Sequence, residues 1–193
     1  ADNNTAMGYD ALEDNTTGSS NTAIGSQALY ENTTGSSNTA IGYHALYTPT
    51  GKTGLTAVGY EALKLNSTGS NNHAFGFQAL ANNSTGNYNN AFGHQALESN
   101  TDGNNNCAFG LNALFANTTA NDNTAIGHAA LTDNSTGHSN TAVGSGSLDA
   151  NQTGHSNTAV GYLSLSADVE GNRNIAIGYH AGQSQNNADD NVW

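Results

Sequence analysis

The feature that most constrains this 193-residue chain is an unbroken internal repeat. The string Asn-Thr-Ala-Ile-Gly, or a close variant, begins eleven times, and every interval is 17 residues. Numbering each copy from 1 to 17 gives the consensus N-T-A-(I/V/F)-G-x-x-A-L-x-x-N-(T/S)-T-G-x-x. A fixed period of this length predicts one structural unit stacked on the next. The copies begin at Asn4, Asn21, Asn38, Leu55, Asn72, Asn89, Asn106, Asn123, Asn140, Asn157 and Asn174.

The repeat divides the chain into three parts. Residues 1–3 form a lead-in, residues 4–190 form the eleven copies, and residues 191–193 begin a twelfth copy. The first residues lack the basic and apolar segments of a signal peptide. We therefore expect the sequence to be a mature protein or a fragment of a longer one.

Composition excludes several classes of protein. Leu, Ile, Val and Phe together number only 29, and charged residues make up 9% of the chain, so a helical bundle, a coiled coil and a large-cored enzyme are not expected. The net charge of −12 disfavours nucleic acid and anionic membrane surfaces as partners, because both are bound through clustered Lys and Arg. No stretch approaches the roughly 18 consecutive apolar residues of a membrane span, so membrane insertion is not expected.

Local patterns within each copy predict an all-β fold, a parallel β-solenoid of eleven 17-residue coils. Polarity alternates through N-T-A-I-G, which is typical of a short strand, and a second extended segment is expected around the Leu at position 9. Asn and Gly in N-T-T-G are typical turn residues. Positions 4 and 9 are the expected core. Its residues include Ile24, Ile41, Phe75, Phe92, Phe109, Leu29, Leu46, Leu80 and Leu97.

The invariant small residues at positions 3 and 5 suggest contact between chains. Two large buried side chains per coil are few when set against the entropy of ordering 17 backbones, so further burial is needed. Small residues let a second backbone approach closely, which predicts a side-by-side homo-oligomer with cyclic symmetry. The expected interface residues include Ala23, Ala40, Ala125, Ala142, Gly25, Gly42, Gly127 and Gly144.

The motif N-T-A-I-G-Y-x-A-L followed by N-T-T-G resembles the repeats of phage tail-fibre proteins and bacterial surface proteins that end in an intramolecular chaperone domain. It is more distantly similar to the head repeats of trimeric autotransporter adhesins. The resemblance covers residues 4 to 190. It implies a left-handed β-roll, a homotrimer and a role in attachment at an extracellular location, either a virion tail or a bacterial cell surface.

Candidate binding residues lie in the variable columns. Tyrosines recur at position 6, where they could stack on sugar rings or pack between chains. His138 and His155, at position 16 of consecutive copies, stack one coil apart; they could bind a metal ion or be solvated turn residues. No cofactor is expected, whether calcium or a histidine-bound metal. The expected receptor is a cell-surface glycan or protein, and the tyrosines concerned are Tyr43, Tyr60, Tyr162 and Tyr179.

Several other motifs have a structural explanation. No nucleophile-elbow, P-loop or zinc spacing occurs, so no enzymatic activity is expected. Asn at position 12 fits glycosylation acceptors, but it is also suited to capping a turn and to forming a ladder along the rod. Cys107 is expected to face inward.

An alternative function is an ice-binding solenoid, since position 14 presents Thr17, Thr34, Thr68, Thr85, Thr119, Thr136 and Thr153.

Overall fold

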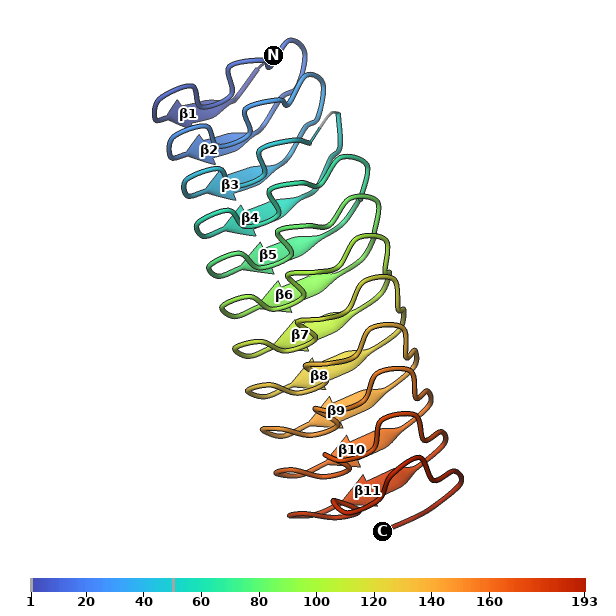
Figure 1. Cartoon of the computed structure of the whole chain (residues 1–193). Helices are drawn as coiled ribbons and strands as arrows, with labels where there is room; N and C mark the ends of the chain where they lie inside the picture. The colour runs from blue at the N-terminus through green and yellow to red at the C-terminus, as the bar shows by residue number, and fades with distance from the viewer. Residues whose placement is uncertain (1, 50) are drawn as a thin grey trace.

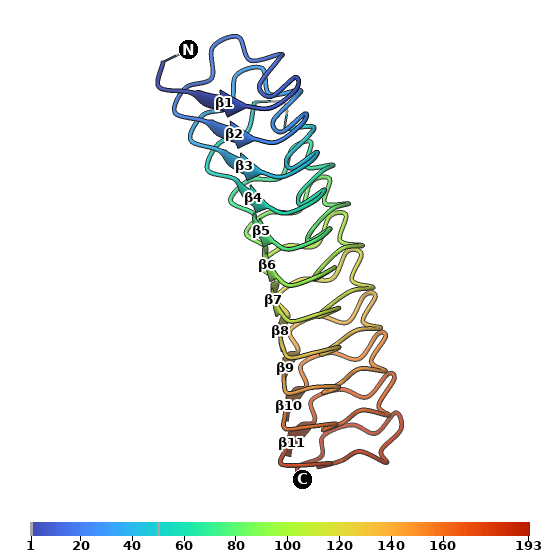
Figure 2. The same ribbon diagram turned by 90° about the vertical axis from the view of Figure 1, so that its left-hand side faces the viewer.

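Each copy of the repeat forms one coil of a parallel β-solenoid, and the coils stack into a rod (Figure 1). This computed structural model describes residues 2–49 and 51–193; Ala1, the first residue of the expected lead-in, lies outside that range. Figure 2 shows the strands along one side of the rod, with the two termini at opposite ends. The described residues contain no helix, and so none that could cross a membrane.

Every coil contributes one strand of three residues to a single eleven-stranded sheet, in which the strands follow the order of the chain. Equivalent positions pair directly, as Ala23 does with Ala40. A constant period therefore places each repeat position in a straight column along the rod. The strands are β1 (Thr5–Met7), β2 (Thr22–Ile24), β3 (Thr39–Ile41), β4 (Thr56–Val58), β5 (His73–Phe75), β6 (Asn90–Phe92), β7 (Cys107–Phe109), β8 (Thr124–Ile126), β9 (Thr141–Val143), β10 (Thr158–Val160) and β11 (Ile175–Ile177).

The strands turn their alanine side to the core, which reverses the expectation from sequence. Position 3 is completely buried within the single chain in every copy after the first, so Ala23, Ala40, Ala125 and Ala142 cannot contact another chain. Position 4 points outward, and the assignment of that column to the core is wrong. Ile41 and Phe109 are exposed, and Ile24, Phe75 and Phe92 are partly exposed.

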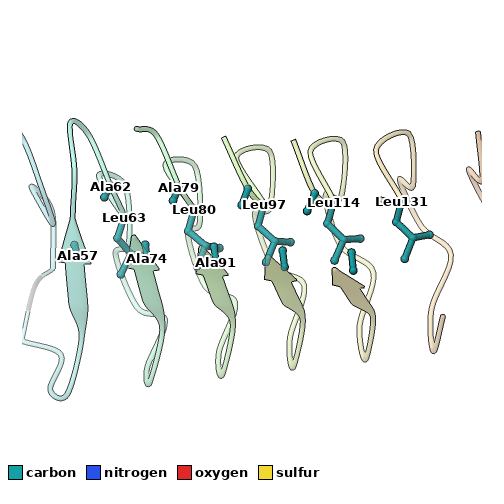
Figure 3. Close-up of a cluster of buried hydrophobic side chains, with 14 of the residues drawn as sticks. Ala57, Ala62, Leu63, Ala74, Ala79, Leu80, Ala91, Leu97, Leu114 and Leu131 are labelled. Carbon is teal, nitrogen blue, oxygen red and sulfur yellow. The ribbon is translucent and has the colours of Figure 1, made fainter. Parts of the chain in front are cut away.

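Leucine at position 9 explains why only alanine fits at position 3. Leu29, Leu46, Leu80 and Leu97 are fully buried inside the coil, as expected, together with the alanines of position 8. Figure 3 shows Leu63, Leu80, Leu97, Leu114 and Leu131, with alanine side chains beside them, at the same place in successive coils. The coil is narrow, so the leucine fills its interior and leaves room for no more than a methyl group on the strand.

The expected second strand around this leucine does not form. Residues at positions 7 and 9 adopt left-handed backbone conformations, as at Gln95 (φ 57°) and Leu97 (φ 54°). The N–H of Gln95 donates to Phe77 in the preceding coil (2.8 Å), whereas the N–H of Leu97 donates to Ala113 in the following coil (3.0 Å). The segment is therefore bonded to both of its neighbours without being a strand.

Glycine at position 5 is required within the chain. Gly25, Gly42, Gly127 and Gly144 have φ between 130° and 138°, a region that side chains disfavour. A Cβ atom on Gly25 would lie against the carbonyl group of Gly42 in the next coil. The same close approach recurs at the other three glycines, so packing of coil on coil is sufficient to explain why this column is invariant, and contact of these glycines with another chain stays a prediction.

Two ladders of buried asparagine tie the coils together. At position 1, Asn123 Oδ1 accepts a hydrogen bond from the Asn140 N–H (2.9 Å), and its Nδ2 donates to the Gly137 carbonyl (2.9 Å). At position 12, Asn117 Nδ2 donates to Asn100 Oδ1 (2.8 Å) and to the Ala120 carbonyl (3.2 Å). These amides are fully buried and hydrogen-bonded, so the glycosylation pattern at position 12 is a structural motif in the folded chain.

The position 12 ladder is interrupted where its residue changes. Pro49 and Asp168 replace asparagine, and the preceding Asn32 and Asn151 are left with buried, unpaired Oδ1 atoms. Asp168 instead accepts hydrogen bonds from several neighbours, including the Gly171 N–H (2.9 Å). Each interruption therefore leaves an unsatisfied buried group, which is expected to lower stability locally.

Replacing Asn123 by alanine should strongly destabilise the fold. The change leaves the Asn140 N–H buried without a partner, at about 1–3 kcal/mol, whereas the Gly137 carbonyl loses one donor and keeps the other, Asn134 Nδ2 (2.9 Å). We expect the free energy of unfolding in urea to fall by about 2–4 kcal/mol. The control is Asn82→Ala, since the side chain of Asn82 is exposed. A loss below about 0.5 kcal/mol for Asn123→Ala would contradict the structural role of the ladder.

Candidate interaction face

The outward side of the sheet is the candidate functional site. Positions 2 and 4 share this side because side chains alternate along a strand, and position 6 is exposed just beyond the glycine that ends it. We call the side chains at positions 2, 4 and 6 the outer stripe. It follows the whole length of the rod, because each position forms a straight column.

The central column of the stripe is apolar and open to solvent. Position 4 holds only Met, Ile, Val or Phe, with Met7 64% exposed and Ile126 43% exposed. In the middle of the rod the rings of Phe75, Phe92 and Phe109 stack, with centroids 4.6 Å and 4.5 Å apart. A continuous apolar column of exposed and partly exposed side chains is a candidate interaction site.

The stripe carries no charge, although the chain is strongly acidic. None of the 15 acidic and three basic residues occupies position 2, 4 or 6 in any copy. Charged residues are depleted at the centres of protein interfaces. Copies with a net charge of −12 repel each other, so a contact between them has to keep carboxylates away. The distribution of charge fits self-association along this face.

Tyrosines of position 6 are exposed, but they stack on one another. Tyr43 lies 5.3 Å from Tyr60, Tyr60 lies 5.1 Å from Phe77, and Tyr162 lies 5.5 Å from Tyr179, measured between ring centroids. Stacked rings cover each other's faces and present their edges. Since stacking on a sugar needs an open face, this geometry favours the other expectation, packing between chains.

Cys107 lies on the outer stripe, and the expectation that it faces inward is wrong. It occupies position 2 of β7, next to the buried Ala108, and is partly buried. Burial raises the pKa of the Cys107 thiol, so the thiol is favoured over the reactive thiolate.

The threonines of position 14 form a single exposed column in the turn. Hydroxyl groups of the adjacent position 13 are used within the chain: Thr16 Oγ1 donates to the Thr33 carbonyl (2.8 Å) and Thr101 Oγ1 to the Thr118 carbonyl (3.1 Å). A flat ice-binding face needs two adjacent columns of free hydroxyls. The turn supplies one such column.

Polar side chains at position 7 form a partly buried cluster. The His44 ring stacks on Tyr43 (3.8 Å), and His44 Nε2 lies 2.7 Å from Gln27 Oε1. Burial, and then the charge of Lys64, lower the pKa of His44, while Glu61 opposes this shift. Burial raises the pKa of Glu61, but hydrogen bonds from Lys64 (2.8 Å) and Gln78 outweigh it and the pKa is lowered.

His138 and His155 lie at the surface in the turn before the strand, with their rings stacked 4.8 Å apart as expected. In the described part of the chain, no group of three or more His, Cys, Asp or Glu residues could hold a metal ion, and no pocket is present. The outer stripe is the candidate functional feature that the sequence analysis did not predict. The sequence did contain a signal for it, because positions 2, 4 and 6 hold no Asp, Glu, Lys or Arg in any copy.

Comparison with known proteins does not assign this chain to a family. No protein-family model, curated protein or solved structure matches the chain.

Lowering the pH should destabilise the protein through His44. The pKa of His44 is lower in the folded state than in the unfolded state, so the unfolded chain binds the proton more tightly. Its contribution to stability is complete above about pH 6.5 and is lost as the pH falls through the folded pKa. In urea unfolding at about pH 7.5 and about pH 5.5, His44→Gln should lose less stability than the wild type. An identical loss in both proteins would rule out this role, and exposed His128→Gln is the control.

Proposed function

We propose that the protein is a non-enzymatic attachment rod that works as a homotrimer, with its chains joined along the outer stripe. It would form the shaft or head of a phage tail fibre or bacterial surface adhesin, outside the cell, and contact a cell-surface glycan or protein. The observation that carries the proposal is the uncharged, apolar stripe along the whole length of an otherwise acidic rod.

The stripe is large enough to hold chains together. Eleven coils at about 4.8 Å give a length of about 50 Å, and the four steps from position 2 to position 6 give a width of at most about 13 Å. The resulting area, about 650 Å², approaches the roughly 800 Å² per partner of a stable interface. In a parallel cyclic trimer, the position 4 columns of the three chains face the common axis, so their apolar residues meet there along the length of the rod.

Trimerisation and left-handed coiling are supported by the resemblance to tail-fibre and autotransporter repeats. The stripe supports self-association, and a cyclic arrangement lets each chain use the same face. Columns 10, 11, 14, 16 and 17 stay outside such a contact. They carry hydroxyl, amide, imidazole and carboxylate groups, which are suited to hydrogen bonding with a receptor. Repetition along three chains would turn weak individual contacts into avidity.

A carboxylate on the stripe should break the assembly. Phe92→Asp would place a charge at the middle of the proposed contact, whereas Phe92 itself is only partly buried in the single chain. We expect analytical ultracentrifugation to show a trimer for the wild type and a smaller, folded species for Phe92→Asp. Thr136→Asp, which adds the same charge at an exposed turn position, should remain trimeric. A monomeric wild type would refute the assembly.

Attachment should depend on the assembly. Binding to bacterial cells or to a glycan panel should be about 10²- to 10⁴-fold weaker for Phe92→Asp than for the wild type, because dissociation removes avidity. Phe92→Leu keeps the apolar surface and should bind like the wild type. A trimer that binds neither cells nor glycans would refute the attachment function while leaving the assembly intact.

A further inference from the structure

The side chain at position 16 usually accepts a hydrogen bond that links two coils, but His138 and His155 at this position do not. In every other copy this position is Ser, Thr, Asn or Asp. Its side-chain oxygen typically accepts a hydrogen bond from the N–H at position 16 of the preceding coil, as Asn121 does from Asn104 (2.7 Å) and Asn172 from His155 (3.0 Å). Among the described residues, neither His138 nor His155 makes this bond. The two imidazoles are thus not required by the ladder.

The geometry of the two rings is repeated from one coil to the next. The rings are parallel within 3°, with centroids 4.8 Å apart. Each Nδ1 lies 3.3 Å from the hydroxyl of the following serine, Ser139 or Ser156. When Nδ1 carries the proton, it donates to this hydroxyl and the lone pair of Nε2 is free. Metal-binding histidines commonly have such a partner for their second nitrogen.

We propose that Nε2 of His138 and Nε2 of His155 together bind one divalent transition-metal ion of the Cu²⁺, Ni²⁺ or Zn²⁺ class. Two nitrogen ligands at about 2.0–2.1 Å from a tetrahedral ion are about 3.4 Å apart, and each lone pair lies in its ring plane, so both rings have to tilt out of their parallel stack for the two Nε2 atoms to converge on the ion. Both side chains lie at the surface, which permits this movement. Water completes the coordination, and Cu²⁺ binds most tightly because imidazole sites follow the Irving–Williams order.

The other histidines lack this arrangement. His44 Nε2 is engaged by Gln27, His94 stacks on Phe77, and His180 stacks on Tyr179. His128 has Leu111 and Ser145 at the same position of the adjacent coils, and His73 has Thr56 and Asn90. Position 16 also lies outside the outer stripe, so metal binding does not rest on the proposed trimer or on the attachment function.

Calorimetric titration of the full chain, without a histidine tag, tests the site. Cu²⁺, Ni²⁺ and Zn²⁺ are titrated separately, and we expect one ion per chain. His138→Asn and His155→Asn should each weaken binding by about tenfold or more. Asparagine is a residue that position 16 uses elsewhere, so both variants should keep the wild-type melting temperature without metal. His128→Asn should bind like the wild type.

The pH provides a second readout. Binding should weaken as the pH is lowered, because protons compete with the metal ion for imidazole nitrogen. Absence of binding to the wild type, or an unchanged dissociation constant in His138→Asn or His155→Asn, would overturn the proposal. Equal loss of binding in His128→Asn would do so as well, since it would indicate non-specific binding by surface histidines.

Discussion

The hydrogen bond that a buried asparagine makes to the next coil is the interaction on which the rest of this structure depends. In the position 1 ladder, one amide satisfies a backbone N–H in the following coil and a backbone carbonyl of its turn, as Asn123 does for Asn140 and Gly137. Turns that lie inside a stack would otherwise carry unpaired buried groups. The ladders therefore allow a chain with few large apolar residues to close a dry interior.

The narrow interior of the coil explains why the apolar residues of position 4 lie on the outer face. Leucine at position 9 fills the interior, so the strand can turn only alanine inward and must turn its bulkier residue outward. Ile, Val and Phe at position 4 are exposed as a consequence. The packing rule that stabilises one coil thus also creates the apolar column, and the constant register extends it from Met7 to Ile177.

Columns also explain how surface chemistry can arise in such a protein. A turn residue contributes little by itself, but the same residue in two successive coils is held about 4.8 Å from its copy. Phe75 with Phe92, Tyr43 with Tyr60, and His138 with His155 are all pairs of this kind. Function in a solenoid of this type is best sought where neighbouring copies depart together from the consensus.

The sequence by itself determined the period, the parallel stacking of coils, the interior position of leucine and the asparagine ladder in the turn. Each of these follows from repetition, since a residue held at one position must satisfy the same contacts in every coil. Sequence did not determine which side of the strand is buried. Alternation of side chains along the strand places Ala125 and Ile126 on opposite sides, but it does not say which of the two faces inward. The sequence analysis assigned the larger residue to the core, and the structure shows that the alanine is buried there instead.

Only the tertiary structure decided that question, because the answer depends on the space left by Leu131 across the coil. It also decided that Gly127 accommodates the close approach of the next coil, and that the segment through Leu131 is left-handed backbone rather than strand. Both features depend on distances between residues 17 apart. A pattern within one copy of the repeat does not contain those distances, so the outer stripe became visible only when the coils were stacked.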